Sequence, residues 1–119
     1  MANTIDDLQK AYAICTGTFL EVLGLIGFVS SPIANVIGVN LVMSFLHLVV
    51  GALGWLALKG LGRGYCAGMG ASLLFLGVLG FVPGIAGVLT STLGTNTATS
   101  TLHAAVGSVS LAMAFGVKE

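Results

Sequence analysis

Four long apolar runs constrain this chain more than any motif does. They cover residues 12–29, 39–58, 65–82 and 97–117, and each is close to the roughly 20 residues with which an α-helix crosses the hydrocarbon core of a bilayer. Of the 119 residues, 56% are hydrophobic and only 7% are charged, with a mean hydropathy of +1.07. A soluble domain carries about 25% charged residues, so this composition argues against that class. We predict an all-α integral membrane protein, a four-helix bundle forming one membrane domain over residues 1–119.

The run at 97–117 is less apolar than the other three. Its first half, TATSTLHAAVGS, consists mostly of small and polar side chains. Small residues let neighbouring backbones approach closely, so such a helix suits a position against other helices better than one against lipid. We expect this segment to pack on its neighbours within the bundle.

The basic residues predict how the chain is oriented in the membrane. All four lie before the first run, between the second and the third, or after the fourth: Lys10, Lys59, Arg63 and Lys118. The two opposite loops, residues 30–38 and 83–96, carry no charge. Because cytoplasmic loops hold the excess of Lys and Arg, both termini and the loop at 59–64 are predicted to be cytoplasmic. Four basic residues and a net charge of zero also argue against a nucleic-acid partner.

The two halves of the chain resemble one another. A shift of 53 residues aligns AYAICTGTFLEVLGLIGFV with GYCAGMGASLLFLGVLGFV. A three-residue insertion in the second outer loop then aligns further identical residues: Asn40 with Asn96, Ser44 with Ser100, His47 with His103, and Gly51 with Gly107. We interpret the chain as two copies of one transmembrane hairpin, at about 10–58 and about 65–117, joined by the loop at 59–64. Both copies start on the same side, so the repeats are parallel and related by a pseudo-two-fold axis along the membrane normal.

The repeated motifs carry a resemblance to a known family. Each hairpin has LGxxGFV in its first helix, at 23–29 and 76–82, and an N(x)₆H stretch that opens its second, at 40–47 and 96–103. Over residues 12–116 the chain resembles the DUF4383 family of small four-helix bacterial membrane proteins. The resemblance implies a four-helix fold in a prokaryotic cytoplasmic or internal membrane. It implies no activity, because the family's function is unknown.

Glycines recur at heptad spacing in the first and third runs. The positions are Gly17, Gly24, Gly70, Gly77 and Gly84. Seven residues return to nearly the same face of a helix, so each run presents a flat strip on which another backbone can lie closely. We predict helix packing at these glycines; the alternative is space for a macrocycle or a lipid chain.

Three ionisable residues are predicted to lie inside the membrane: Glu21, His47 and His103. At 1.5 Å per residue, Glu21 lies about 13 Å and His47 about 16 Å from the cytoplasmic ends of their helices. The depths nearly coincide, so a hydrogen bond between Glu21 and His47 is within reach. Leu74 occupies the position equivalent to Glu21, and the second copy cannot repeat that bond. Buried ionisable groups in a membrane are costly, so they are candidates for function.

The histidines allow three interpretations. Each ring can bond a hydroxyl or carbonyl group across the bundle. Alternatively, His47 and His103 are cofactor ligands, clamping one haem iron between them or each holding the magnesium of a chlorophyll-type pigment. A third interpretation is a proton or ion path that combines Glu21 with a histidine.

Other residues point to structure rather than chemistry. Asn40 is the predicted N-cap of the second helix, and Asn96 or Thr97 is the predicted N-cap of the fourth. Cys15 and Cys66 are predicted to be unpaired packing residues. The sequence has no GxxxxGK[ST], HExxH or CxxC motif, so we predict neither an enzyme nor a conventional metal site.

These observations favour a structural or accessory membrane subunit. Its partners are expected to be the lipid bilayer and other membrane subunits or a second copy of the chain, against which it packs laterally. The alternative function is cofactor binding through the paired histidines. A third is transport of protons, ions or small molecules by an oligomer, because four helices are few for a pore.

Overall fold

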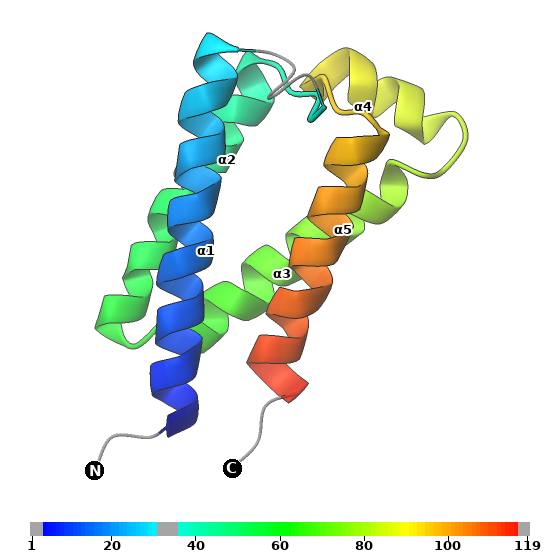
Figure 1. Cartoon of the computed structure of the whole chain (residues 1–119). Helices are drawn as coiled ribbons and strands as arrows, with labels where there is room; N and C mark the ends of the chain where they lie inside the picture. The colour runs from blue at the N-terminus through cyan, green and yellow to red at the C-terminus, as the bar shows by residue number, and fades with distance from the viewer. Residues whose placement is uncertain (1–3, 31–35, 117–119) are drawn as a thin grey trace.

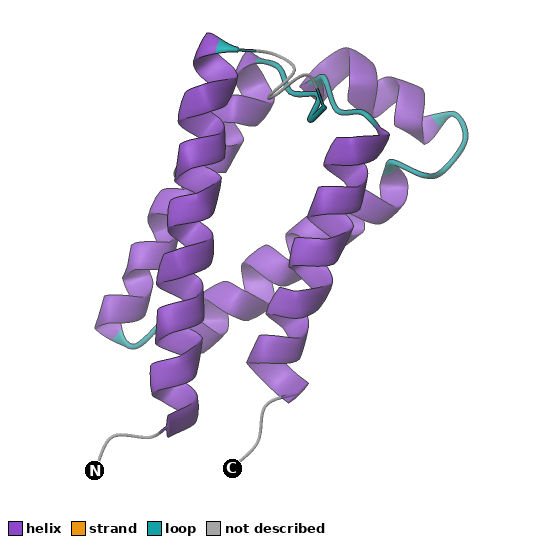
Figure 2. Cartoon of the chain, viewed as in Figure 1, coloured by secondary structure: helices purple, strands orange, loops and turns teal. Residues whose placement is uncertain are grey.

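The computed structural model describes residues 4–30 and 36–116, and the regular structure in these ranges is helical (Figure 2). In chain order the elements are α1 (Thr4–Val29), α2 (Leu41–Leu53), the 3₁₀ helix η1 (Gly54–Lys59), α3 (Gly62–Leu79), α4 (Ile85–Leu93), α5 (Thr97–Leu111) and the π-helical turn η2 (Ala112–Gly116). Helix η1 continues α2, and η2 continues α5 (Figure 1).

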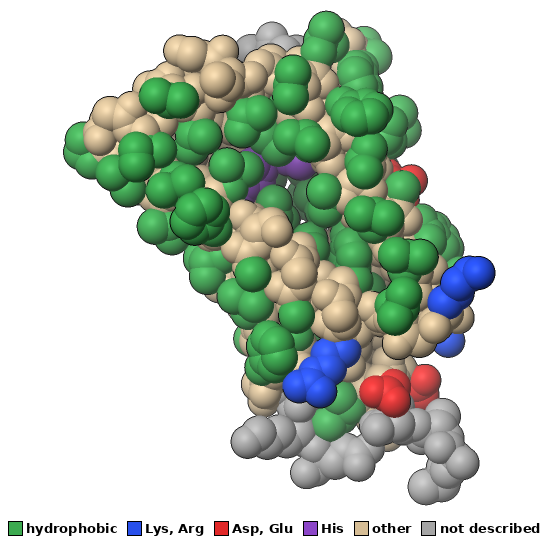
Figure 3. All heavy atoms as spheres, turned by 180° about the vertical axis from the view of Figure 1, so that it is seen from behind, with side chains coloured by type: hydrophobic (Ala, Val, Ile, Leu, Met, Phe, Trp, Pro, Cys, Tyr) green, Lys and Arg blue, Asp and Glu red, His purple; other side chains and the backbone are tan. Residues whose placement is uncertain are grey.

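Four helical stretches are long and apolar enough to cross a membrane: Thr4–Val29, Leu41–Lys59, Gly62–Leu79 and Thr97–Gly116. They correspond to the four predicted runs. Their outer surfaces are apolar, with large side chains such as Leu41 and Phe75 about two-thirds exposed. Figure 3 shows hydrophobic side chains over most of one face, and Lys and Arg side chains toward one end. These features fit an integral membrane protein, whose exterior meets lipid.

The helices are arranged as two hairpins. Helix α1 lies along α2, α3 packs on α5, and α1 also contacts α3 (Figure 1). The first turn of α1 and the last turn of η2 lie at the same end of the molecule. Between the hairpins is an apolar core of six buried side chains: Leu20, Leu23, Val39, Met43, Met69 and Leu73.

Glycines bring the helices of each hairpin together. An added Cβ at Gly17 would lie 2.5 Å from the carbonyl oxygen of Gly51, and one at Gly77 would lie 2.5 Å from the backbone nitrogen of Ala104. Gly24 meets the backbone of α2, and Gly70 meets that of α5, in the same way. The heptad glycines of α1 and α3 therefore lie where backbones touch, as helix packing requires, and leave no slot for a macrocycle.

Gly84 does not belong to this packing set. Helix α3 ends at Leu79, three residues before the predicted end of the third run. Gly84 instead precedes α4 with φ of 87°, in the left-handed region that glycine adopts readily, and an added Cβ there would meet nothing within 4 Å. Its heptad spacing from Gly77 has no consequence, because the helix has already stopped.

Two further differences concern segments outside the four apolar runs. The predicted loop at 83–96 contains α4, which is only nine residues long and has no buried residue. Helix α1 begins at Thr4, well before residue 12, and its first turn carries Asp6 and Asp7. Hydropathy detects membrane-crossing segments, so a short surface helix and a polar first turn escape it. Acidic side chains in a first turn also stabilise the positive end of the helix dipole.

Candidate functional site

His47 of α2 and His103 of α5 meet in the interior between the two hairpins. Their Nε2 atoms lie 3.0 Å apart, and the rings are nearly perpendicular, at 81°. Both residues are only 1% exposed. A neutral imidazole has one N–H donor and one acceptor nitrogen, so two neutral rings suffice for this bond. The pair therefore joins the hairpins without placing a net charge in the membrane.

The start of each helix sets the depth of its histidine. Asn40 is the N-cap of α2, as predicted, and Asn96, one of the two predicted candidates, is the N-cap of α5. Their side-chain oxygens accept from the backbone N–H of Met43 and Thr99, respectively. Each histidine comes seven residues after its cap, about 10 Å along the helix axis. Two helices capped at one level thus present their imidazoles at one level.

The capping asparagines also tie the hairpins to one another. The Asn40 Nδ2 donates to the carbonyl of Thr92 at 2.8 Å, and the Asn96 Nδ2 donates to that of Val36 at 2.9 Å. Both the donors and the acceptors are 56 positions apart, the spacing that aligns His47 with His103. These reciprocal bonds, above the histidine pair, fix the distance between the first turns of α2 and α5.

Tyrosines form a second set of ties near the opposite end. Tyr65 donates to the carbonyl of Val50 at 2.8 Å, and Tyr12 shares a 2.7 Å hydrogen bond with Ser110. The hydroxyl of Ser110 in turn bonds the carbonyl of Val106, the position equivalent to Val50. Each tyrosine thus reaches from one hairpin to the other. The contacts pair equivalent positions, as two copies of one hairpin around a pseudo-two-fold axis would.

The surroundings of the two rings differ. His47 Nδ1 and the hydroxyl of Ser44, one turn earlier in α2, are buried without a hydrogen-bond partner. An apolar cavity of about 160 Å³ adjoins His47, lined also by Leu20, Met43 and Ser72 among others. Figure 3 shows His side chains in a hollow among hydrophobic ones. His47 thus uses one ring nitrogen to bond His103, and its other nitrogen stays without a hydrogen-bond partner.

In the described geometry the two Nε2 atoms are too close for a macrocycle to lie between them. Two metal–nitrogen bonds of about 2.0–2.1 Å in line would hold the Nε2 atoms about 4 Å apart, with the macrocycle between them. Here the two Nε2 atoms bond each other directly, whereas Nδ1 of His47 has no hydrogen-bond partner. Among the described residues there is also no group of three or more His, Cys, Asp or Glu that could hold a metal ion.

The predicted hydrogen bond between Glu21 and His47 does not form. The Oε1 atom of Glu21 accepts from the indole N–H of Trp55 at 2.8 Å. Leu20, the preceding residue, points into the core, so Glu21 lies about 100° further around α1 and is partly exposed. Glu21 and His47 lie at compatible depths, but the Glu21 side chain does not face the interior in which His47 lies. A proton or ion path from Glu21 to His47 would therefore lack a direct hydrogen bond between the two side chains.

Sequence reasoning missed Trp55, although a signal was present. In the antiparallel hairpin Gly24 faces Leu48, and Gly17 faces Gly54. Glu21 lies between these two glycines on α1, so this register places Gly51 opposite it, and Trp55 follows about one turn later in the chain. Trp55 has the only long side chain with an N–H donor there.

Another set of polar contacts lies at the end of the bundle that carries the basic side chains. The Gln9 side chain donates to the carbonyl of Met113, and Arg63 donates to that of Ala114, each at 3.0 Å. The Arg63 guanidinium also lies 5.2 Å from the centre of the Phe115 ring, within cation–π range. These donors satisfy carbonyls at the end of η2 that lack helical partners.

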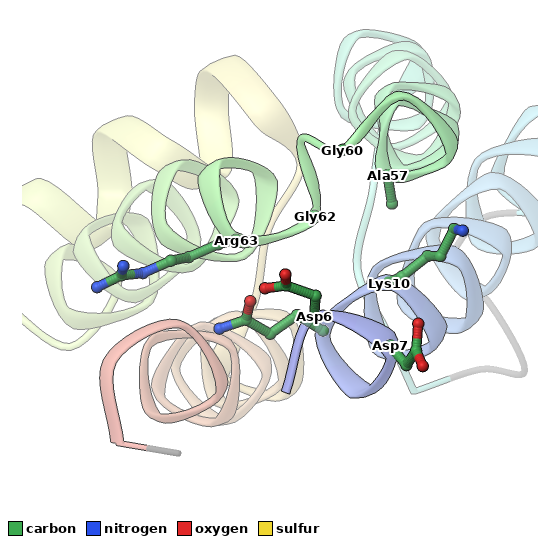
Figure 4. Close-up of a pocket in the computed structure, with 8 residues that line it drawn as sticks. Asp6, Asp7, Lys10, Ala57, Gly60, Gly62 and Arg63 are labelled. Atoms are coloured by element: carbon green, nitrogen blue, oxygen red, sulfur yellow. The ribbon is translucent and has the colours of Figure 1, made fainter. Parts of the chain in front are cut away.

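A cavity of about 180 Å³ lies at the same end (Figure 4). Asp6, Asp7, Lys10 and Arg63 are among its lining residues. In Figure 4 the Arg63 side chain points away from the other three. Charges of both signs that do not converge make a solvated end surface rather than an anion or cation site.

The cysteines are both free, Cys15 exposed and Cys66 buried.

Comparison of the chain with models of known protein families, with curated protein sequences and with solved structures finds no match. The resemblance to the DUF4383 family stays a prediction.

Proposed function

We propose that this chain is a non-catalytic membrane subunit that acts by packing laterally in a membrane complex. One observation carries the proposal: the hydrogen bonds that cross between the two hairpins use polar side chains of the chain itself, while the outer surface is apolar. The histidine pair, the tyrosines and the capping asparagines all join one hairpin to the other. Such a bundle has its polar groups directed to its own assembly, and its exterior is suited to lipid and to neighbouring helices.

The orientation is part of the proposal. Lys10, Lys59 and Arg63 lie near one end, which we assign to the cytoplasm together with both termini. Helix α4 lies at the opposite end (Figure 1). Its hydroxyl side chains bond carbonyls of their own helix, and Val88 is 58% exposed. An uncharged short helix of this kind suits the outer membrane–water interface.

The test is the size and composition of the native assembly. The tagged chain, expressed at its natural level in its own membrane, is extracted in mild detergent and separated on a native gel, and co-migrating proteins are identified. We expect a defined assembly that contains other membrane subunits. A chain that migrates only as itself, in several detergents and after cross-linking in the membrane, would contradict the proposal.

An absorption spectrum of the same preparation separates this function from cofactor binding. We expect no Soret or chlorophyll band. A band that disappears in His47→Ala or His103→Ala protein would overturn the proposal in favour of a cofactor protein, and would require the rings to separate from the arrangement described above.

A further inference from the structure

Glu21 is the acidic side chain that the bundle itself does not account for. It lies eight residues before Val29, the last residue of α1, which places it about 12 Å inside the outer end of the helix. The other described acids, Asp6 and Asp7, lie in the first turn of α1, at the charged end. A carboxyl group at the depth of Glu21 is costly in lipid and usually has a partner or a function.

The carboxyl group is only half satisfied within the chain. Oε1 accepts the hydrogen bond from Trp55, and the described residues supply no second partner. Glu21 is partly exposed and Trp55 is 47% exposed, so the pair lies at the lipid-facing surface of the α1–α2 hairpin. Hydrocarbon offers no hydrogen-bonding group, and one carboxyl oxygen therefore needs a partner from outside the chain.

Membrane geometry identifies that partner. Two copies of the chain inserted in the same orientation carry Glu21 at the same depth. A neutral carboxyl has one O–H donor and acceptor oxygens, and so it complements a second carboxyl: each O–H donates to an oxygen of the other. We propose that Glu21 joins two copies of this chain into a dimer through such a carboxyl pair, with Trp55 holding each carboxyl in place. The proposal rests on the lateral-packing function above and names a second copy as its first partner.

The neighbouring residues suit close approach of a second copy. On α1, Thr18 and Leu25 lie one turn to either side of Glu21, and both are exposed. On α2, the exposed Ala52 lies one turn before Trp55. Small residues beside a polar one are the usual composition of a helix–helix interface in a membrane. The described cations lie toward the charged end, so none is available at the depth of Glu21 to replace the carboxyl partner.

The two halves of the chain differ at this position, which limits the assembly to a pair. Leu74 stands where the repeat would place a second glutamate, and it meets Gly107 as Glu21 meets Gly51. Only one face of the bundle therefore carries the carboxyl. A contact between identical faces around a two-fold axis closes on itself and does not grow further.

The first experiment measures self-association of the purified chain in phosphatidylcholine vesicles by energy transfer between labelled copies. We expect a dimer for the wild type and for Glu21→Gln, because an amide also has a donor and an acceptor. Glu21→Leu should raise the dimer dissociation constant at least tenfold, since the acid pair loses two hydrogen bonds between helices. Leu74 shows that leucine packs at this register, and circular dichroism checks that the variant is folded.

A second measurement leaves Glu21 unchanged. In a Cys15→Ser background, Leu25→Cys is compared with Val78→Cys, the equivalent position of the other hairpin, which is similarly exposed at 52% against 56%. We expect cross-links between copies at position 25 and few at position 78. Monomeric wild type, a Glu21→Leu dimer as tight as wild type, or equal cross-linking at both positions would each overturn the dimer. None of these results bears on other subunits, which the native gel tests separately.

Discussion

A buried imidazole has two nitrogens that need hydrogen-bond partners. In the histidine pair some of these nitrogens have a partner and one does not. The Nε2 atoms of His47 and His103 satisfy one another, whereas Nδ1 of His47 is buried without a partner. Removal of one ring strands the Nε2 of the other. A stranded buried polar group costs about 1–3 kcal/mol, while replacement of both partners by apolar groups can be nearly neutral.

The losses in unfolding free energy caused by His47→Leu and His103→Leu should therefore not add up to the loss in the double variant. We expect each single variant to lower the free energy of unfolding by about 1–3 kcal/mol. The double variant should lose less than the two together, with a coupling of about 1 kcal/mol, within the range measured for hydrogen bonds between membrane helices. Unfolding in mixed detergent micelles, followed by circular dichroism, gives the three values. Strictly additive losses would show that the rings do not depend on one another.

At the scale of the helices, glycine controls how closely each hairpin packs. Gly17 and Gly70 face the backbones of α2 and α5, so a methyl group at either position requires the facing helix to shift. Gly68, two residues from Gly70 on the same helix, has open space around its Cβ position. The same substitution therefore acts with opposite sign at neighbouring positions of α3.

We expect Gly17→Ala and Gly70→Ala to lower the stability by about 1–3 kcal/mol, the usual effect of overpacking. Gly68→Ala should raise it by up to about 1 kcal/mol, because alanine loses less backbone entropy in a helix. Thermal unfolding in one detergent compares all three with the wild type. If Gly70→Ala behaved like Gly68→Ala, the close contact of α3 with α5 would be wrong.

For the whole molecule, the main consequence of the arrangement is its two different ends. The described cations lie toward the end where α1 begins and η2 stops, and α4 lies at the other end. In the orientation that we propose from the positive-inside rule, the first end faces the cytoplasm. Leu61 in the loop at 59–64 and Ser91 on α4 are both exposed, and neither is charged, so cysteines there leave the orientation signal intact.

Accessibility to a membrane-impermeant maleimide reports the orientation. In intact cells Ser91→Cys should react at once, and Leu61→Cys should react only after the membrane is opened. The wild type serves as the control, because Cys66 is buried and Cys15 lies among the apolar residues of a groove between α1 and α5. Labelling of Leu61→Cys in intact cells, with protection of Ser91→Cys, would reverse the proposed orientation.

The sequence by itself determined the features that depend on position along a helix. Hydropathy and length located the four helices that are able to cross a membrane. Residue type located the cap at Asn40 and narrowed the second cap to Asn96 or Thr97. Equal spacing from those caps then set His47 and His103 at one depth. Each of these follows from the rise per residue and from local chemistry, which the chain carries in its own order.

Tertiary structure decided which faces meet. The sequence allowed His47 to bond Glu21, but packing turned His47 toward His103 and left Glu21 with Trp55. Neighbouring residues on a helix point about 100° apart, so a small rotation of the helix about its axis changes the partner of every side chain. That rotation is set by contacts with other helices, and it has no local signal in the sequence.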